Sequence, residues 1–452
     1  MTAPINDFYA ELKARLEAQG VAYALASYVD MHGVCKSKVV PLVHLDRMMA
    51  GSELCTGAAL DGVPQDVSDE EVSPHPDPDS MMILPWRRDV AWFASDLWCD
   101  GQPFAPCNRS IFKRVLKQAE DMGFTFNFGI EPEFFLLKET QEGIAPIGPR
   151  DTLAKPAYDV RSTLDSFELL ELIVRELNTL GYDVYSYDHE DGNGQFEIDF
   201  TYADGLTMAD RFVFFRLLVN ELAHRHGYFA SFMPKPFSDR AGSGAHYNMS
   251  LADISSGKNL FEDKADLRGL GLSKIAYQFI AGILKHLPAL SAVVSPTVNS
   301  YKRLIKEGSM SGFTWAPVFA CYGNNNRTNS VRVPGTSPRV ELRSADIANN
   351  PYLGGALALA AGLEGIRNEL DPGEPHRENM YLKSEQELAE LGVGYLPRTL
   401  QEATQALERD PLAREVMGDA MHDAYIEYKR GEWDSYHNHV SDWEVARYAR
   451  FL

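Results

Sequence analysis

The stretch Gly129-Ile130-Glu131-Pro132-Glu133-Phe134-Phe135-Leu136-Leu137 places two carboxylates inside an apolar run. Residues 124–137 are mostly apolar and aromatic, which predicts a strand that is buried on at least one face. Side chains two positions apart on a strand point the same way, so Glu131 and Glu133 should project together. Ionised carboxylates on a largely buried strand are costly unless a positive group compensates them. The stretch therefore predicts a bound cation; a pair of edge-strand glutamates that face water is the alternative.

The composition is that of a soluble globular protein large enough for two or more domains. The chain has 452 residues, of which 45% are hydrophobic, and its formal net charge is −21. This charge argues against nucleic acid or an anionic membrane as the main partner. The five cysteines form no CxxC pair, so neither a disulfide framework nor a zinc site is expected. Without an apolar signal core or a run of ~18 apolar residues, we expect a cytoplasmic protein.

Residues 1–105 predict a small, mostly β domain. Residues 63–80 are acidic, rich in proline and free of Lys and Arg, which predicts an exposed loop. The rest of this part is expected to form one helix at 6–19 and strands at 21–30, 36–42, 81–86 and 89–94.

Residues 106–452 predict a second, larger domain in which strands and helices alternate. Residues 295–350 are expected to be rich in loops, and acidic helices complete the chain. The strands carry polar outward residues, which favours an α+β domain with a mainly antiparallel sheet. Helices are expected at 109–122, 163–180, 208–226, 272–287 and 353–370, and strands at 124–137, 183–188, 195–201, 228–233 and 245–251.

Four further segments carry charged or polar residues where strands of this sheet are expected. Glu190 and Glu197 flank a glycine-containing turn, and His246 shares a strand face with two other polar residues. Arg303 lies in a third segment, and the fourth covers residues 327–343. Each segment alone has an ordinary structural alternative, such as a turn cap or a surface ion pair. Together they predict one polar site.

The residue types in this site predict phosphoryl transfer. Carboxylates are hard oxygen donors that suit Mg²⁺ or Mn²⁺ rather than Zn²⁺. Arginines suit planar anions such as phosphate and a substrate carboxylate. Divalent metals neutralise nucleotide phosphates while arginines stabilise the group in transfer. No GxxxxGK[ST] motif is present, which disfavours a P-loop enzyme.

The chain resembles the glutamine synthetase superfamily over nearly its full length. The resemblance implies ATP-dependent ligation, in which glutamate is phosphorylated on its γ-carboxylate and an amine then displaces the phosphate. It also implies an N-terminal β-grasp domain, a C-terminal sheet domain and a dodecamer of two stacked hexameric rings with active sites between subunits. The matching motifs are EPEFFL at 131–136, GQFE at 194–197, MPKP at 233–236, GSGAHYNMS at 242–250, NSYKRL at 299–304, NR…RVP at 326–334, and VELR with NPYL at 340–353.

The resemblance also implies roles for individual residues. One metal would be held by Glu133, Glu190 and Glu197, and the second by Glu131, His246 and Glu341. The glutamate substrate would be bound by Gly242, Arg303 and Arg343. ATP would be contacted by Arg327, Arg332, Arg339, Tyr202, Asn248 and Ser250. Arg327 and Arg343 are also counted as catalytic candidates.

Three departures from the family pattern concern the amine. Relatives that use ammonium carry a glutamate in the loop after NSYKRL, where this chain has Trp315, which we therefore count as a catalytic candidate. The N-terminal aspartate that binds ammonium in relatives is matched only weakly, by Thr56 in Thr-Gly-Ala-Ala, although Asp61 lies close by. The usual asparagine before the GSG turn is Ala241.

These departures favour methylamine as the amine that is joined to glutamate, because the variant set resembles members of the family with that activity. An ordinary glutamine synthetase that uses ammonia and a ligase for larger amines are the alternatives. A non-catalytic member is disfavoured, because it has no reason to keep five inward carboxylates. Trp315 could also merely pack its loop, with Asp61 or Glu307 supplying the missing charge.

Overall fold

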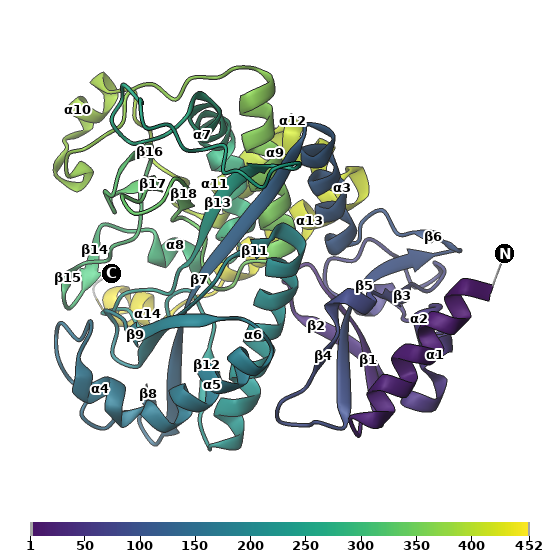
Figure 1. The fold of residues 1–452 in the computed structure, drawn as a ribbon. Coiled ribbons are helices and arrows are strands. Elements are labelled where there is room, and N and C mark those ends of the chain that lie inside the picture. The colour runs from purple at the N-terminus through teal and green to yellow at the C-terminus, as the bar shows by residue number, and fades with distance from the viewer. Residues whose placement is uncertain (1–2, 451–452) are drawn as a thin grey trace.

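The computed structural model describes residues 3–450 and consists of a smaller N-terminal part beside a larger part built on one long sheet (Figure 1). The smaller part begins with helix α1 (Ala3–Ala18), which packs Leu12 and Leu16 onto a six-stranded sheet. The sheet has the order β2-β1-β5-β3, with β1 antiparallel to β2 and parallel to β5. Its strands are β1 (Tyr23–Val29), β2 (Cys35–Pro41), β3 (Ser73–Pro76), β4 (Met82–Ile83), β5 (Val90–Cys99) and β6 (Gln102–Pro103).

The expected loop at residues 63–80 is wrong at its end, because it contains β3. This strand pairs with β5 at the edge of the sheet and buries Pro74 and Pro76. Proline has no N–H to give to a ladder, so strands that contain it are confined to sheet edges, where one row of donors is not needed. The proline-rich composition therefore favoured a loop where the chain forms an edge strand.

The larger part is organised around β7 (Phe124–Thr140), a strand of 17 residues (Figure 1). The order β16-β17-β18-β13-β7-β10-β9 places β7 between β13 and β10, and among the described strands of this sheet only the pair β16 and β17 is parallel. The expected α+β class with a mainly antiparallel sheet is confirmed. The other strands of this sheet are β8 (Gly143–Pro146), β9 (Val184–His189), β10 (Gln195–Phe200), β11 (Ala203–Asp204), β12 (Phe229–Ser231), β13 (Ala245–Asp253), β16 (Phe319–Asn324), β17 (Asn329–Val333) and β18 (Val340–Leu342).

The helices agree with expectation except at two points. The helix expected at 272–287 continues through Pro288 to Val294. The helix expected at 163–180 is interrupted at Ser166, which separates α4 (Val160–Asp165) from α5 (Phe167–Thr179). The segment 295–350, expected to be rich in loops, also holds α8 (Ser300–Arg303) and the hairpin of β14 (Glu307–Ser309) and β15 (Gly312–Phe313). The remaining long helices are α3 (Asn108–Asp121), α6 (Gly205–Arg225), α7 (Lys274–Val294), α9 (Pro351–Arg367), α11 (Leu400–Arg409) and α13 (Asp419–His437).

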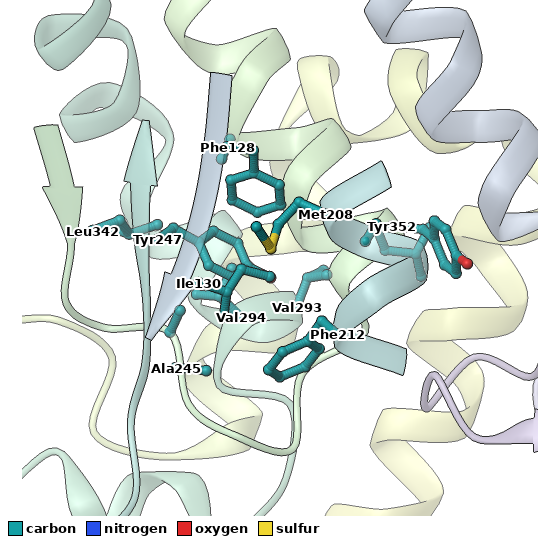
Figure 2. Packing of buried hydrophobic residues seen from close by; sticks show 14 of the residues in the cluster. Phe128, Ile130, Met208, Phe212, Ala245, Tyr247, Val293, Val294, Leu342 and Tyr352 are labelled. Carbon is teal, nitrogen blue, oxygen red and sulfur yellow. The ribbon is translucent and has the colours of Figure 1, made fainter. Parts of the chain in front are cut away.

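The main core lies on one face of β7, where even-numbered side chains such as Phe128 and Ile130 are buried against α6, α7 and α9. Figure 2 shows this packing between the sheet and the helices. Because successive residues alternate between faces, Glu131 and Glu133 lie on the opposite face. The helix α7 is the one described helix long and apolar enough to span a bilayer, but 83% of its most apolar window is buried inside the protein.

A buried ion-pair network joins the two parts. The guanidinium of Arg109, on α3, donates to Asp210 on α6 over 3.0 and 2.9 Å and to Asp77 of the smaller part over 2.8 Å. Arg109 is only 3% exposed, so removing it would leave buried carboxylates without their counter-charge. This network fixes the smaller sheet against the helices that cover β7. The division at residue 105 stays a prediction.

Candidate active site

The sheet register lines up the predicted site residues across five neighbouring strands. On one side of β7, Glu197 of β10 lies opposite Glu133, and on the other side His246 of β13 lies opposite Glu131. Farther along, Glu341 of β18 pairs with Asn248 of β13 and with Arg332 of β17. Residues far apart in the sequence thus form one row because each strand alternates its faces with the same period.

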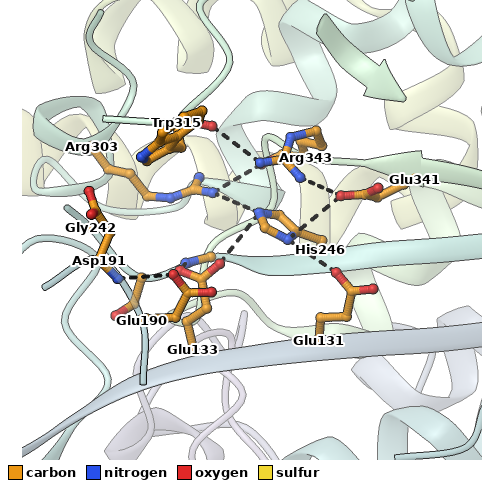
Figure 3. A network of polar contacts seen from close by, with 12 residues as sticks. Glu131, Glu133, Glu190, Asp191, Gly242, His246, Arg303, Trp315, Glu341 and Arg343 are labelled. Carbon is orange, nitrogen blue, oxygen red and sulfur yellow. Dashed lines mark hydrogen bonds and ion pairs between the residues drawn. The ribbon is translucent and has the colours of Figure 1, made fainter. Parts of the chain in front are cut away.

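His246 is the centre of this row (Figure 3). Its Nδ1 lies 3.3 Å from Glu131 Oε2 and 3.8 Å from Glu341 Oε1, and its Nε2 lies 3.7 Å from Glu133 Oε1. Burial, together with Arg343, holds the pKa of His246 well below its usual value, so the imidazole is neutral. A neutral imidazole among carboxylates is a metal-ligand arrangement.

The glycines of the GSG turn let the chain approach these groups closely. A Cβ on Gly242 would lie 2.5 Å from the Pro234 carbonyl oxygen, and one on Gly244 would lie 2.7 Å from His246 Nε2. The Gly244 N–H donates to Glu133 Oε2 over 2.7 Å, and Gln195 Nε2 donates to the same oxygen over 3.2 Å. The turn therefore fixes the carboxylate of Glu133 and leaves no room for a side chain at either glycine.

Buried arginines occupy the other side of the site. Arg303 donates to the carbonyl oxygens of Ser344 over 3.1 Å and Arg343 over 3.0 Å, which fixes its guanidinium before any ligand arrives. Arg343 and Arg332 both donate to the fully buried carboxylate of Glu341. Burial raises the pKa of Glu341, but Arg343 and other neighbours outweigh burial and the net direction is downward.

For Glu190 and Glu197, around β10, burial and like charges outweigh the favourable contacts, and the net pKa direction is upward. Burial, then the charge of Glu133, raises the pKa of Glu190 to about 8. Burial, then the charge of Glu190, raises the pKa of Glu197 well above its usual value. Like charges held together in a buried site are stable only with a cation or a proton among them.

Two groups of residues have ligand atoms close enough for a divalent metal, and a hard cation fits both. The ligand atoms of Glu131, His246 and Glu341 lie within 4.8 Å of one another, as do those of Glu133, Glu197 and His246. The first group is the predicted second metal set. The second group shares Glu133 and Glu197 with the other predicted metal set, but its third member is His246 and not Glu190. Glu190 Oε2 accepts a hydrogen bond from the Asp191 N–H over 3.1 Å.

The residues enclose a cavity of about 500 Å³. All the predicted site residues except Glu341, Tyr202, Asn248 and Ser250 line it: Glu131, Glu133, Glu190, Glu197, Gly242, His246, Arg303, Trp315, Arg327, Arg332, Arg339 and Arg343. Glu341 lies directly behind His246 and Arg343. Of the proposed nucleotide contacts, Asn248 donates to Glu131 Oε1 over 2.9 Å, Ser250 accepts from Asn127, and Tyr202 is 61% exposed.

Sequence reasoning missed several lining residues. Asp188, on β9, and Asp199, on β10, stand two positions from Glu190 and Glu197, so the rule that paired Glu131 with Glu133 could have found both. Burial, then the charge of Glu131, raises the pKa of Asp199 to about 7. Tyr158 lines the cavity from a position with φ +64, which no sequence pattern indicates.

A flap loop, defined as residues 305–317, covers one end of the cavity with Thr314, Trp315 and Ala316. Trp315 has φ +59, a conformation that costs a non-glycine residue about 1–3 kcal/mol and persists only where surrounding contacts impose it. Its carbonyl oxygen accepts from Arg343 Nη2 over 3.2 Å. The Ala316 carbonyl accepts from the Tyr381 hydroxyl over 2.5 Å, and Tyr381 stacks on Phe313.

The alternative sources of charge considered for the amine lie elsewhere. Glu307 is exposed on β14, and Asp61 is 63% exposed in the smaller part, where its carboxylate is 3.7 Å from His32. Neither residue lines the cavity of its own chain.

A family model described as "Glutamine synthetase, catalytic domain" matches residues 105–448. This chain belongs to the glutamine synthetase family. It is 43% identical over 443 residues to a protein named glutamate–methylamine ligase from Methyloversatilis universalis, with 98% of this chain and 99% of the relative covered. A glutamine synthetase from Rhizobium leguminosarum bv. phaseoli is 38% identical over 96% of this chain and 98% of the relative.

Solved structures give the same family placement. A structure described as "GmaS/ADP complex-Conformation 1" has a TM-score of 0.90 and 39% identity, and covers 97% of this chain and 99% of that chain. A second, described as "Apo GmaS without ligand", has a TM-score of 0.88 and 38% identity, with the same coverage. The family resemblance and the glutamine synthetase fold are confirmed.

Proposed function

We propose that this member of the glutamine synthetase family is an ATP-dependent glutamate–amine ligase with methylamine as its favoured amine. The observation that carries the proposal is a cavity whose lining combines Trp315 of the flap loop with the predicted histidine and arginines and with all the predicted carboxylates except Glu341, which lies behind His246. A relative that is 43% identical over 98% of this chain is named for the same activity.

The reaction has two steps. An oxygen of the glutamate γ-carboxylate attacks the γ-phosphorus of ATP, and ADP leaves. The amine nitrogen then attacks the acyl carbon of γ-glutamyl phosphate, the C–O bond to phosphate breaks, and the nitrogen loses a proton. The products with methylamine are γ-glutamylmethylamide, ADP and phosphate.

The glutamate substrate is proposed to lie between Gly242, Arg303 and Arg343. Gly242 leaves the space that a side chain would fill, and Arg303 is held in place by two carbonyl oxygens. A fixed guanidinium binds a carboxylate without further ordering of its side chain. Arg343, which forms an ion pair with Glu341, would bind the γ-carboxylate and the developing acyl phosphate.

ATP is proposed to enter from the side of Arg327, Arg332 and Arg339, which line the cavity together. Their charges would stabilise the phosphate in transfer. Asn248 connects Glu131 to Arg339, whose Nε donates to Asn248 Oδ1 over 2.6 Å, so it would position both groups. Tyr202 and Ser250 are kept as proposed contacts of the nucleotide.

Mg²⁺ or Mn²⁺ is proposed as the metal, and when bound it would neutralise the nucleotide phosphates and polarise the γ-phosphate. Glu131, His246 and Glu341 would hold one ion, and Glu133, Glu190 and Glu197 would hold the other. The raised pKa of Glu190, caused by burial and then by Glu133, supports a site built for added positive charge.

A dodecamer of two stacked hexamers in the cytoplasm is the proposed assembly, with residues 1–105 as the β-grasp domain that completes a neighbour's site. The support is that Asp61 and Thr56, the sequence candidates for contacting the amine, lie in the smaller part and do not line the cavity of their own chain. They would therefore have to act in the cavity of a neighbouring subunit. We expect light scattering to give a mass of many subunits for the active enzyme. An active monomer would contradict this assembly.

The amine is tested with ATP, Mg²⁺, glutamate and a panel of methylamine, ammonia, ethanolamine and putrescine, with each amide identified by mass spectrometry. We expect the highest kcat/KM with methylamine. Ammonia as the best substrate would identify an ordinary glutamine synthetase, and a larger amine would identify the third alternative. If no amide forms with any amine, the protein is a non-catalytic member of the family.

A further inference from the structure

Asp191 is the one described acidic residue of the cavity lining that is in hydrogen-bond contact with the flap loop. It follows Glu190 directly, at the end of the hairpin of β9 and β10. The Ser311 hydroxyl donates to Asp191 Oδ2, and Ser309 Oγ lies 3.0 Å from Ser311 Oγ. The side chain of Trp315 also faces this carboxylate.

The same residue contacts a predicted metal ligand, Glu190, through its backbone. The Asp191 N–H donates to Glu190 Oε2 over 3.1 Å, as Figure 3 shows. On the far side of the loop, Trp315 is tied through its carbonyl to Arg343, which in turn donates to Glu341. Two of the contacts that hold the flap loop therefore lead to predicted metal ligands, besides its contacts with Tyr381 and with the Asp239 carbonyl.

These contacts explain how the unusual backbone at Trp315 is held. A tryptophan at φ +59 relaxes unless its neighbours impose the conformation. Arg343 fixes its carbonyl, while Asp191 holds the hairpin of β14 and β15 through Ser311. These two contacts hold Trp315 and the hairpin beside this end of the cavity.

We propose that Asp191 is a positioning residue that holds the flap loop closed over the acyl phosphate, with Trp315 at the amine end and water excluded. The proposal rests on the proposed ligase function, because it concerns the second step of that reaction. If the loop opens, a water oxygen attacks the acyl carbon, the C–O bond to phosphate breaks, and a proton is released. The products are then glutamate and phosphate, and ATP is consumed without an amide.

The test compares Asp191→Asn with Ser311→Ala, each of which removes one side of the contact. The quantity measured is the ratio of phosphate released to amide formed at saturating amine. We expect a ratio near one for the parent and about tenfold excess phosphate for each variant. The KM values for ATP and glutamate should stay within about twofold, while KM for the amine rises.

The matched control is Asp239→Asn. Asp239 is exposed and contacts the same loop only through its backbone carbonyl, which accepts from the Met310 N–H over 2.7 Å. Its substitution should leave the ratio unchanged. In the double variant of Asp191→Asn with Ser311→Ala, the excess should be no greater than in either single variant, because both remove one interaction.

An unchanged ratio in both single variants would overturn the proposal, and so would effects that multiply in the double variant. If Asp191→Asn does not fold, Ser311→Ala alone decides, since it deletes one hydroxyl from a loop. The ratio is measured with whichever amine the parent uses best. A parent that prefers ammonia would thus remove methylamine from the proposed function and leave the role of Asp191 to be judged separately.

Discussion

Glu133→Gln is expected to lower kcat for amide formation by about 10³-fold or more while the protein stays folded. The loss corresponds to about 4 kcal/mol of transition-state stabilisation. The amide has nearly the shape of the carboxylate and can still accept from the Gly244 N–H, so the GSG turn keeps its place. What the substitution removes is the negative charge that a hard divalent cation requires.

The control for this variant is Glu139→Gln, because Glu139 is an exposed carboxylate on the same strand. It should match the parent in activity. The second measurement is equilibrium dialysis with Mn²⁺, in which Glu133→Gln should bind less metal than the parent. A variant with activity within a few-fold of the parent would defeat the metal assignment of Glu133.

Substitution of Glu341, which belongs to the other proposed metal set, would be harder to interpret than substitution of Glu133. Its carboxylate is fully buried and accepts from both Arg332 and Arg343. Removing one member of a buried ion pair typically destabilises a protein by about 3–5 kcal/mol. Glu341→Ala would therefore mix lost stability with lost chemistry.

Much of the site could be predicted because the spacing of residues along a strand determines which face of the sheet their side chains point to. The pairs Glu131 with Glu133 and Glu190 with Glu197 needed only that rule and the glycine turn between β9 and β10. The same rule would have found Asp188 and Asp199, which line the cavity beside them. They were missed because no family motif drew attention to them.

The remaining features of the site depend on contacts between segments that are distant in the sequence, and hydrophobic periodicity does not predict such contacts. The row from Glu197 to Arg332 exists because β13 and β18 lie on the far side of β7, a pairing that no local pattern specifies. Backbone conformations such as φ +64 at Tyr158 are likewise imposed by tertiary contacts, because local propensity disfavours them. The contact of Asp191 with Ser311 joins positions 120 residues apart.

The largest change in substrate preference is expected for Trp315→Glu, which should remove most of the preference for methylamine over ammonia. Both amines are mostly protonated at neutral pH, as a lysine side chain is with its pKa of about 10.4. An indole face attracts such a cation by about 0.5–2 kcal/mol, and burial of one methyl group adds about 0.8 kcal/mol. Together these give a preference of about 10- to 200-fold in the parent.

The measurement is kcat/KM for each amine at one pH in the parent, in Trp315→Glu and in Trp315→Phe. Trp315 lines the cavity and is 47% exposed, so its ring is available to a ligand. Phenylalanine keeps an aromatic face under the same strained backbone and should retain part of the preference, whereas glutamate restores a charge that suits a fully hydrated ammonium ion. If Trp315 only packs the flap loop, both substitutions will weaken the two amines equally. A parent that uses ammonia better than methylamine would contradict the role of the ring, because the apolar wall would then add no affinity for a methyl group.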